Sequence, residues 1–187
     1  PRFPPVGMMV KAKKSQLEFM EALRLFVIEV MDGFDIWSDD QLKSLKKINL
    51  GILRKNATQR HGVTRWKKGV KHPECVDDVE VVELHPRLLT DEWKPYAAWV
   101  LHHEFVHALG YFAHDSKFRA LEKLWPSKES PTMGSNFTEM LRRDRATWLW
   151  VCPTCKREFP RQKQGNGKYM CKKCKQILKD VPIPASQ

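Results

Sequence analysis

Four of the five cysteines form two closely spaced pairs near the end of the 187-residue chain. They are Cys152 and Cys155, then Cys171 and Cys174, in the pattern CxxC-x15-CxxC. Two such pairs in one short segment can supply four thiolates to a single tetrahedral metal ion, which is the pattern of a zinc ribbon. A piece as short as residues 152–187 could scarcely fold without that ion. We therefore predict a structural zinc here rather than a redox pair, and we interpret the remaining Cys75 as an ordinary thiol.

The composition is that of a folded chain with no membrane segment. Of its residues, 42% are hydrophobic and 10% are aromatic, which argues against wholesale disorder. No apolar run approaches the roughly 18–20 residues that span a bilayer, and residues 1–9 lack the regions of a secretory signal. Paired cysteines of this kind suit a reducing compartment. We expect an intracellular monomer, in the cytoplasm or nucleoid or in a nucleus, without membrane contact.

Hydrophobic periodicity predicts an α+β domain ahead of the ribbon. Apolar residues recur at helical spacing over residues 15–31 and 96–109. Residues 78–84 are rich in valine and nearly alternate in polarity, which indicates a strand. Pro95 would occupy the first turn of the second of these helices. Asp39 or Asp40 could cap a shorter helix, and Asp115 is a typical N-cap for a further one. We predict a compact domain of a small sheet plus helices over residues 1–147 and the ribbon with a short tail over residues 148–187.

The second of these helices contains His103-Glu104-Phe105-Val106-His107, an HExxH pattern. Positions i and i+4 of a helix lie one above the other, so His103 and His107 can present two imidazoles to one ion. Glu104 would then stand beside the ion, where it can take a proton from a bound water. The helix is otherwise strongly apolar, and buried imidazole and carboxyl groups there would be costly without a compensating metal. We expect the strand over residues 78–84 and the turn after it to form a wall of the cleft beside this helix.

A catalytic zinc needs a third protein ligand and one open position. His114 is the best candidate, because Gly110 lets the chain turn back and Asp115 would start the next helix just after it. We interpret His102 as a neighbouring or surface residue, since its offset from His107 is wrong for a shared ion. His85 is a weaker alternative ligand. No oxyanion stabiliser is evident; Tyr111 is a candidate, although a packing role fits it better.

Positive charge is concentrated in two parts of the chain, whose overall formal net charge is +11. Residues 152–187 carry nine Lys and Arg against two Asp and Glu. Residues 51–72, which we expect to form loops or a hairpin, carry seven basic residues and no acid. Aromatic residues are interleaved with these charges, which is typical of nucleic-acid contacts, although a solvated basic face remains the alternative. The predicted contact residues are Arg54, Lys55, Arg60, Arg65, Trp66, Lys67, Lys68, Lys156, Arg157, Arg161, Lys163, Lys172 and Lys173. Trp148 and Trp150 are expected to pack the ribbon against the first domain.

With these residues the chain resembles the SprT-like (Spartan-type) zinc metalloprotease family. The resemblance covers about residues 15–178 and is carried by the HExxH helix, His114 with Phe118 four residues on, and the ribbon. It implies a zincin-like fold with one catalytic and one structural Zn²⁺, with His103, His107 and His114 as ligands and Glu104 as the catalytic base. It also implies activity that depends on DNA, single-stranded or with single-stranded features, toward proteins crosslinked to DNA.

Two related patterns fit less well. Residues 114–118 also resemble the WLM peptidases. Gly110 completes the HExxHxxG of metzincins, and Met133 could mimic their Met-turn, but the metzincin position for the third histidine holds Ala113.

The function expected from the sequence is a zinc-dependent, DNA-stimulated endopeptidase that acts on DNA-bound or DNA-crosslinked proteins. One alternative is a nucleic-acid-binding zinc protein or adaptor without peptidase turnover. Another is a metalloprotease whose ribbon recruits a protein partner.

Overall fold

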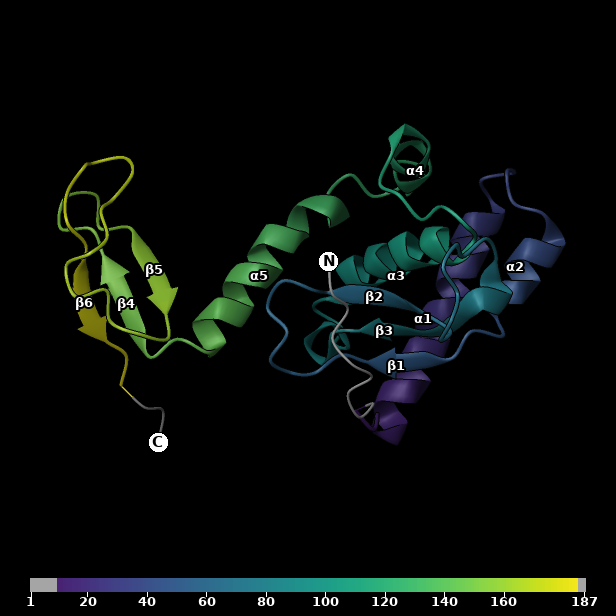
Figure 1. Cartoon of the computed structure of the whole chain (residues 1–187), viewed down its shortest axis with the longest axis horizontal. Coiled ribbons are helices and arrows are strands. Elements are labelled where there is room, and N and C mark those ends of the chain that lie inside the picture. The colour runs from purple at the N-terminus through teal and green to yellow at the C-terminus, as the bar shows by residue number, and fades with distance from the viewer. Residues whose placement is uncertain (1–9, 185–187) are drawn as a thin grey trace. The chain divides into compact units, whose positions relative to one another are not determined.

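The structure is a computed structural model that describes residues 10–184, and it divides into two compact units, Pro1–Met133 and Gly134–Gln187 (Figure 1). The division falls after the first residue of the last helix, so nearly all of that helix lies in the second unit, whereas the sequence prediction placed the boundary after residue 147. Both units combine helical or loop segments with a small sheet, and the α+β class is confirmed. Within residues 10–184, no helix combines the length and the apolar character that crossing a membrane requires.

The first unit packs helices against a three-stranded sheet. Its helices are α1 (Lys14–Asp32), α2 (Asp39–Leu45), α3 (Lys94–Ala108) and α4 (Ser116–Glu122), with short 3-10 turns η1 (Val76–Asp78), η2 (Pro86–Leu88) and η3 (Ser130–Thr132). The strands are β1 (Leu50–Ile52), β2 (Gly62–Trp66) and β3 (Val79–Leu84), in the order β1-β3-β2. β1 runs parallel and β2 antiparallel to the central β3. β2 therefore lies at an edge of the sheet.

Helix α3 is the centre of this unit. It contacts β2, β3, α1 and α4, and ten of its fifteen residues are buried. Pro95 lies in its first turn as expected, where a missing N–H costs nothing. The helix ends before Gly110, whose φ of +100° is unfavourable for other residues and where a Cβ would lie 2.5 Å from the Glu74 carbonyl oxygen. This reversal sends the chain back along the last turn of α3.

Several predicted elements have their expected bounds within a few residues. The first helix is α1, the predicted strand is β3, and Asp115 caps α4 by accepting a hydrogen bond from the Phe118 N–H at 2.9 Å. The cap of α2 is Ser38 rather than an aspartate, with Gln41 completing a capping box. The basic stretch was predicted as a loop or hairpin. It forms β1 and β2, which pair with β3 and not with each other.

The second unit contains α5 (Met133–Asp144) and a three-stranded antiparallel sheet. The strands are β4 (Trp148–Val151), β5 (Glu158–Arg161) and β6 (Lys179–Pro182), in the order β5-β4-β6. The small core consists of Trp150, Leu178 and the buried cysteines Cys152 and Cys171. Trp150 thus packs inside its own unit, which differs from the predicted role of joining the ribbon to the first domain.

Candidate metal centres

Three histidines of the first unit converge on one point. His103 and His107 lie one turn apart on α3, and His114 is returned to them by the turn at Gly110. The Nε2 atom of His114 lies 3.0 Å from that of His107 and 3.2 Å from that of His103. The three side chains can therefore offer one ligand atom each to a single metal ion.

The other ring nitrogens fix which atoms face inward. His103 Nδ1 lies 2.7 Å from the Glu122 carboxylate, and His107 Nδ1 lies 2.8 Å from the carbonyl oxygen of Tyr111. Both partners can only accept, so each Nδ1 carries the proton and each Nε2 presents a lone pair. His114 Nε2 carries at most one proton, so it can donate to the Nε2 lone pair of His103 or of His107 but not to both. A cation at the shared point would satisfy all three.

These separations suit zinc. Two imidazole nitrogens bound at about 2.0–2.1 Å with tetrahedral angles lie about 3.4 Å apart. Burial, which is the largest effect, lowers the pKa of His103 and lowers that of His107 to about 4. Both rings are therefore neutral near pH 7, the form that binds a metal. Metal-binding histidines usually donate the N–H of the non-ligating ring nitrogen to a carboxylate or a backbone carbonyl, as His103 and His107 do here.

A buried phenylalanine forms the floor of the cluster. The ring centroid of Phe118 lies 4.8, 4.5 and 4.7 Å from those of His103, His107 and His114. Its side chain is fully buried, and the Asp115 cap fixes the first turn of α4 that carries it. The same helix supplies Glu122, so α4 both supports and orients the histidines.

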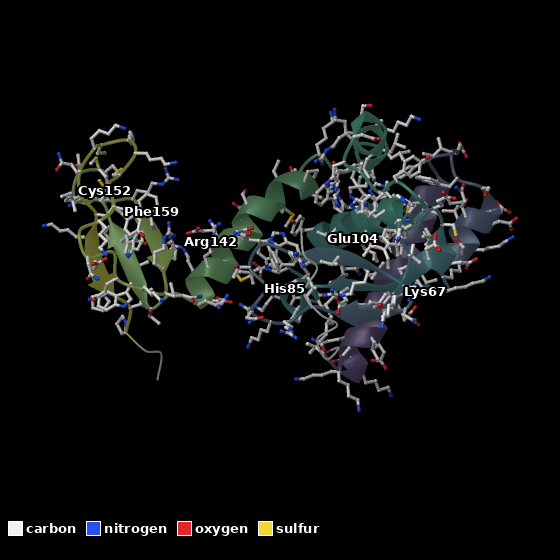
Figure 2. The ribbon with its side chains drawn as sticks, viewed as in Figure 1. Lys67, His85, Glu104, Arg142, Cys152 and Phe159 are labelled. Carbon is white, nitrogen blue, oxygen red and sulfur yellow. The ribbon has the colours of Figure 1, made fainter. Side chains whose placement is uncertain are left out.

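Glu104 lies on α3, the residue after His103, and is labelled in Figure 2. The Thr64 hydroxyl on β2 donates to Glu104 Oε2 at 2.8 Å and also lies 3.1 Å from the Glu104 carbonyl oxygen. Burial raises the pKa of this carboxyl to about 7, although the Thr64 hydroxyl lowers it in part. A carboxyl with a pKa near 7 can both accept and return a proton at neutral pH.

The edge strand approaches α3 closely because of one glycine. A Cβ at Gly62 would lie 2.6 Å from Val100 Cγ1 and 2.9 Å from Glu104 Oε1. β2 therefore forms the wall beside Glu104. The strand that we predicted for this role, over residues 78–84, is instead the central strand β3. The sequence held no signal that would have selected Gly62, Thr64 or Glu122, because each acts on a residue distant in sequence.

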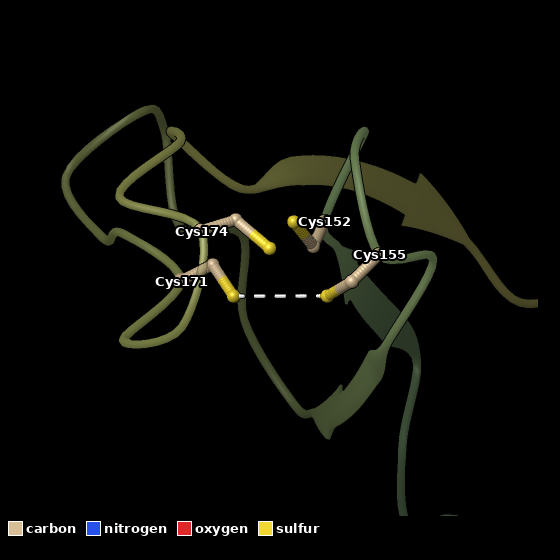
Figure 3. A group of neighbouring side chains, drawn as sticks. All are labelled: Cys152, Cys155, Cys171 and Cys174. Carbon is tan, nitrogen blue, oxygen red and sulfur yellow. Dashed lines mark hydrogen bonds between the residues drawn. The ribbon is translucent and has the colours of Figure 1, made fainter.

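The four predicted cysteines gather in the second unit (Figure 3). Cys155 Sγ and Cys171 Sγ lie 3.8 Å apart, the separation of about 3.8 Å that two thiolates bound to zinc at about 2.3 Å would have. The Arg157 N–H is the main cause that lowers the pKa of Cys155, whereas contact with Cys155 raises that of Cys174 to about 12. A cation at the centre of the group would compensate the negative charge of thiolates held this close together.

The remaining histidine and tyrosine candidates have packing roles. His102 is fully buried rather than on the surface, stacked on Trp125 at 5.1 Å and edge-on to Phe34 at 5.7 Å. His85 is also buried and accepts the Arg87 N–H, so it supports the loop after β3 instead of reaching the cluster. Tyr111 contributes its backbone carbonyl, and its ring lies edge-on to Trp37.

The predicted nucleic-acid residues differ in their availability. Arg65 is bound to the buried carboxylate of Glu83 on β3, so its guanidinium already has a partner. Trp66 is half-buried against Phe112, with ring centroids 6.1 Å apart. Arg161 is half-buried. The other ten side chains are exposed: Arg54, Lys55, Arg60, Lys67, Lys68, Lys156, Arg157, Lys163, Lys172 and Lys173.

A comparison of the chain with protein-family models, curated proteins and solved structures finds no match. The fold and the two sites define an α+β protein. It has a three-histidine group and a four-cysteine group, and each group could hold a metal ion such as zinc.

Proposed function

We propose that this chain is a zinc-dependent endopeptidase of the SprT-like type, stimulated by DNA and acting on DNA-bound or DNA-crosslinked proteins. The observation that carries the proposal is the convergence of three Nε2 atoms, together with a buried carboxyl of pKa about 7 on the helix that carries two of those histidines. Three protein ligands leave a fourth tetrahedral position for water or substrate, which distinguishes a catalytic zinc from a structural one. The four-cysteine group leaves no such position and fits a structural zinc.

Zinc held by His103, His107 and His114 would polarise a peptide carbonyl and make water acidic enough to attack it near pH 7. Glu104 accepts the proton of the attacking water and returns it to the leaving amine. Thr64 holds the Glu104 carboxylate by its hydroxyl, and Glu122 holds His103 in the ligating tautomer. These residues perform the proton transfer and the positioning that peptide hydrolysis requires.

The edge strand supports a peptide substrate. β2 pairs with β3 on one side only, and no strand pairs with its other side within residues 10–184. An extended chain can add to such an edge through backbone hydrogen bonds, largely regardless of its side chains. Added there, it would pass beside Glu104, which Thr64 of the same strand contacts.

The charge distribution supports DNA as the partner. Exposed lysines follow β2 directly at Lys67 and Lys68, and seven of the chain's eleven excess positive charges lie in residues 152–187. Basic surfaces of this kind bind phosphate backbones and raise the local concentration of DNA-bound proteins. An adaptor without turnover would use the same surfaces but would not need the buried Glu104.

The test is cleavage of a basic DNA-binding protein by the zinc-loaded chain, with and without single-stranded DNA. Wild-type protein should cleave, and more rapidly with DNA. Glu104→Gln should lose roughly 10²- to 10⁴-fold in rate while it keeps its zinc. If the variant and the wild type cleave at the same rate, or DNA makes no difference, the proposal is wrong as stated. Zinc binding without cleavage by either protein would favour the adaptor.

A further inference from the structure

A cavity of about 600 Å³ lies within the second unit, and helix α5 forms one wall while β5 and the turn before it form the other. Figure 2 labels one residue of each wall, Arg142 on α5 and Phe159 on β5. Five cationic side chains line it, against two carboxylates: Arg142, Arg143, Lys156, Arg157 and Arg161. Three of the five were expected to contact nucleic acid, and the two arginines of α5 were not.

Arg143 joins the two walls by pairing with both carboxylates. Its guanidinium lies 3.2 Å from Glu139 on α5 and 3.3 Å from Glu158 on β5. The other four cations form no ion pair within the described part of the chain. The cavity therefore has a net excess of about three positive charges, and that excess resides on side chains free to bind an anion.

Aromatic rings hold two of these cations in place. The Arg157 guanidinium lies 5.3 Å from the centroid of Phe159, and that of Arg161 lies 4.9 Å from Trp150 and 6.0 Å from Phe159. Cation–π contacts use the flat face of a guanidinium and leave the N–H groups at its edge available. In Arg161 one of these groups, on Nη1, already donates to the Pro160 carbonyl oxygen at 2.7 Å. Phe159 is thus covered by arginines, so a base stacked on this ring would have to displace them.

Lys156 shares its backbone conformation with Lys175, so Lys175 can serve as a matched control. Lys156 ends the first cysteine turn with φ of +59°, and Lys175 ends the second with φ of +56°. In each turn the lysine N–H bonds to the carbonyl of the first cysteine, at 3.0 Å for Lys156 and 2.8 Å for Lys175. The left-handed conformation favours glycine. The two lysines are therefore matched in conformation and charge, but only Lys156 lines the cavity.

We propose that this cavity binds backbone phosphates of nucleic acid through Arg142, Lys156, Arg157 and Arg161, without stacking a base. The proposal rests on the proposed function only in taking DNA as the anionic polymer. Because the cavity recognises phosphate and not bases, its affinity depends on salt and is nearly the same for normal and abasic strands. In this proposal α5 contributes to phosphate binding, and Phe159 packs against arginine side chains instead of stacking on bases.

The test uses the full zinc-loaded chain and a fluorescent oligonucleotide of about 12 nucleotides, with affinity measured by anisotropy over a range of salt concentrations. Lys156→Gly should weaken binding and reduce the slope of log K against log salt by about 0.7, the value for one phosphate contact on a single strand. Lys175→Gly relieves the same backbone conformation and removes the same charge, and it should leave the slope unchanged. Arg142→Gln, on the exposed face of a helix, should match Lys156→Gly.

Four results would overturn the inference. The first is an equal effect of the two glycine variants, and the second is no effect of Arg142→Gln. The third is binding of an abasic strand more than about tenfold weaker than the normal strand, since base stacking contributes about 1–3 kcal/mol per base. The fourth is stronger competition by a phosphorylated peptide than by the unlabelled oligonucleotide.

The same binding assay separates this inference from the proposed function. Glu104→Gln should bind the oligonucleotide as the wild type does. If cleavage is absent but the cavity variants lose affinity as expected, the peptidase proposal fails and the phosphate site stands. If DNA-stimulated cleavage is present but the cavity variants bind normally, only the phosphate site fails.

Discussion

Replacing Glu122 should weaken the three-histidine site selectively. Its carboxylate lies 2.7 Å from His103 Nδ1 and 2.8 Å from Arg119 Nη1, and its side chain is only 12% exposed. Removing the acceptor behind a ligating histidine typically costs 10- to 100-fold in metal affinity. That loss equals about 1.4–2.7 kcal/mol, which agrees with the roughly 1.5–3 kcal/mol assigned to a hydrogen bond with a charged group.

Two variants separate the effect of the Glu122 charge from the effect of its hydrogen-bond acceptor. Glu122→Gln keeps an oxygen that can accept from His103 Nδ1 and removes only the charge, so it should show the smaller loss of about tenfold. Glu122→Ala removes the acceptor as well and should approach 100-fold. Glu18→Gln is the control, because Glu18 is an exposed partner of Lys14 on α1, where such pairs contribute little.

Zinc affinity can be measured by competition with a chromogenic chelator, and the four-cysteine group serves as the internal reference. Its affinity should be unchanged in all three variants. If Glu122→Ala holds zinc at the histidines as tightly as Glu18→Gln does, the support assigned to Glu122 is wrong. Equal loss at both sites would indicate general unfolding and would also contradict the reasoning.

Three further substitutions test the packing, the electrostatics and the second site. Gly62→Ala should lower the free energy of unfolding by about 1–3 kcal/mol, because its methyl group would overlap Val100; Gly33→Ala, where the nearest atom lies at 3.5 Å, should not lower it. In metal-free protein, Glu104→Gln should raise the free energy of unfolding by about 3 kcal/mol at pH 8 and far less at pH 5, measured by denaturant titration. Folding raises the pKa of Glu104 from 4.5 to about 7, so its ionisation opposes folding increasingly as pH rises through this range. Cys174→Ser should reduce bound zinc from two equivalents to one by elemental analysis, and retention of both would exclude the four-thiolate site.

Local chemistry made part of this structure predictable from the sequence. The apolar period of α1 and α3, the Pro95 start and the Asp115 cap each depend on residues within a few positions of one another. The two metal groups were predictable for the same reason, since HExxH and CxxC place their ligands one turn apart on a helix or in a tight turn.

The features that were not predictable depend on contacts between distant segments. Thr64 meets Glu104 and Glu122 meets His103 only because the sheet and α4 bring them together. Arg65 was expected to face DNA from its charge alone, but a buried carboxylate on the neighbouring strand binds it. His102 was assigned from helical spacing to a neighbouring or surface position, yet Trp125 and Phe34 enclose it. The pattern of residue types along an element predicts which of its faces is buried, but not which distant residues pack against that face.

The most direct test of the account is a zinc-edge anomalous diffraction measurement on crystals of the zinc-loaded protein. It should show two ions. One should be bound by the Nε2 atoms of His103, His107 and His114 at about 2.0–2.1 Å with a fourth position held by no protein atom, and the other should be enclosed by four sulfur atoms at about 2.3 Å. A single ion at the cysteines, or a histidine site whose fourth position is filled by a protein side chain, would contradict the claim that this chain carries a hydrolytic zinc.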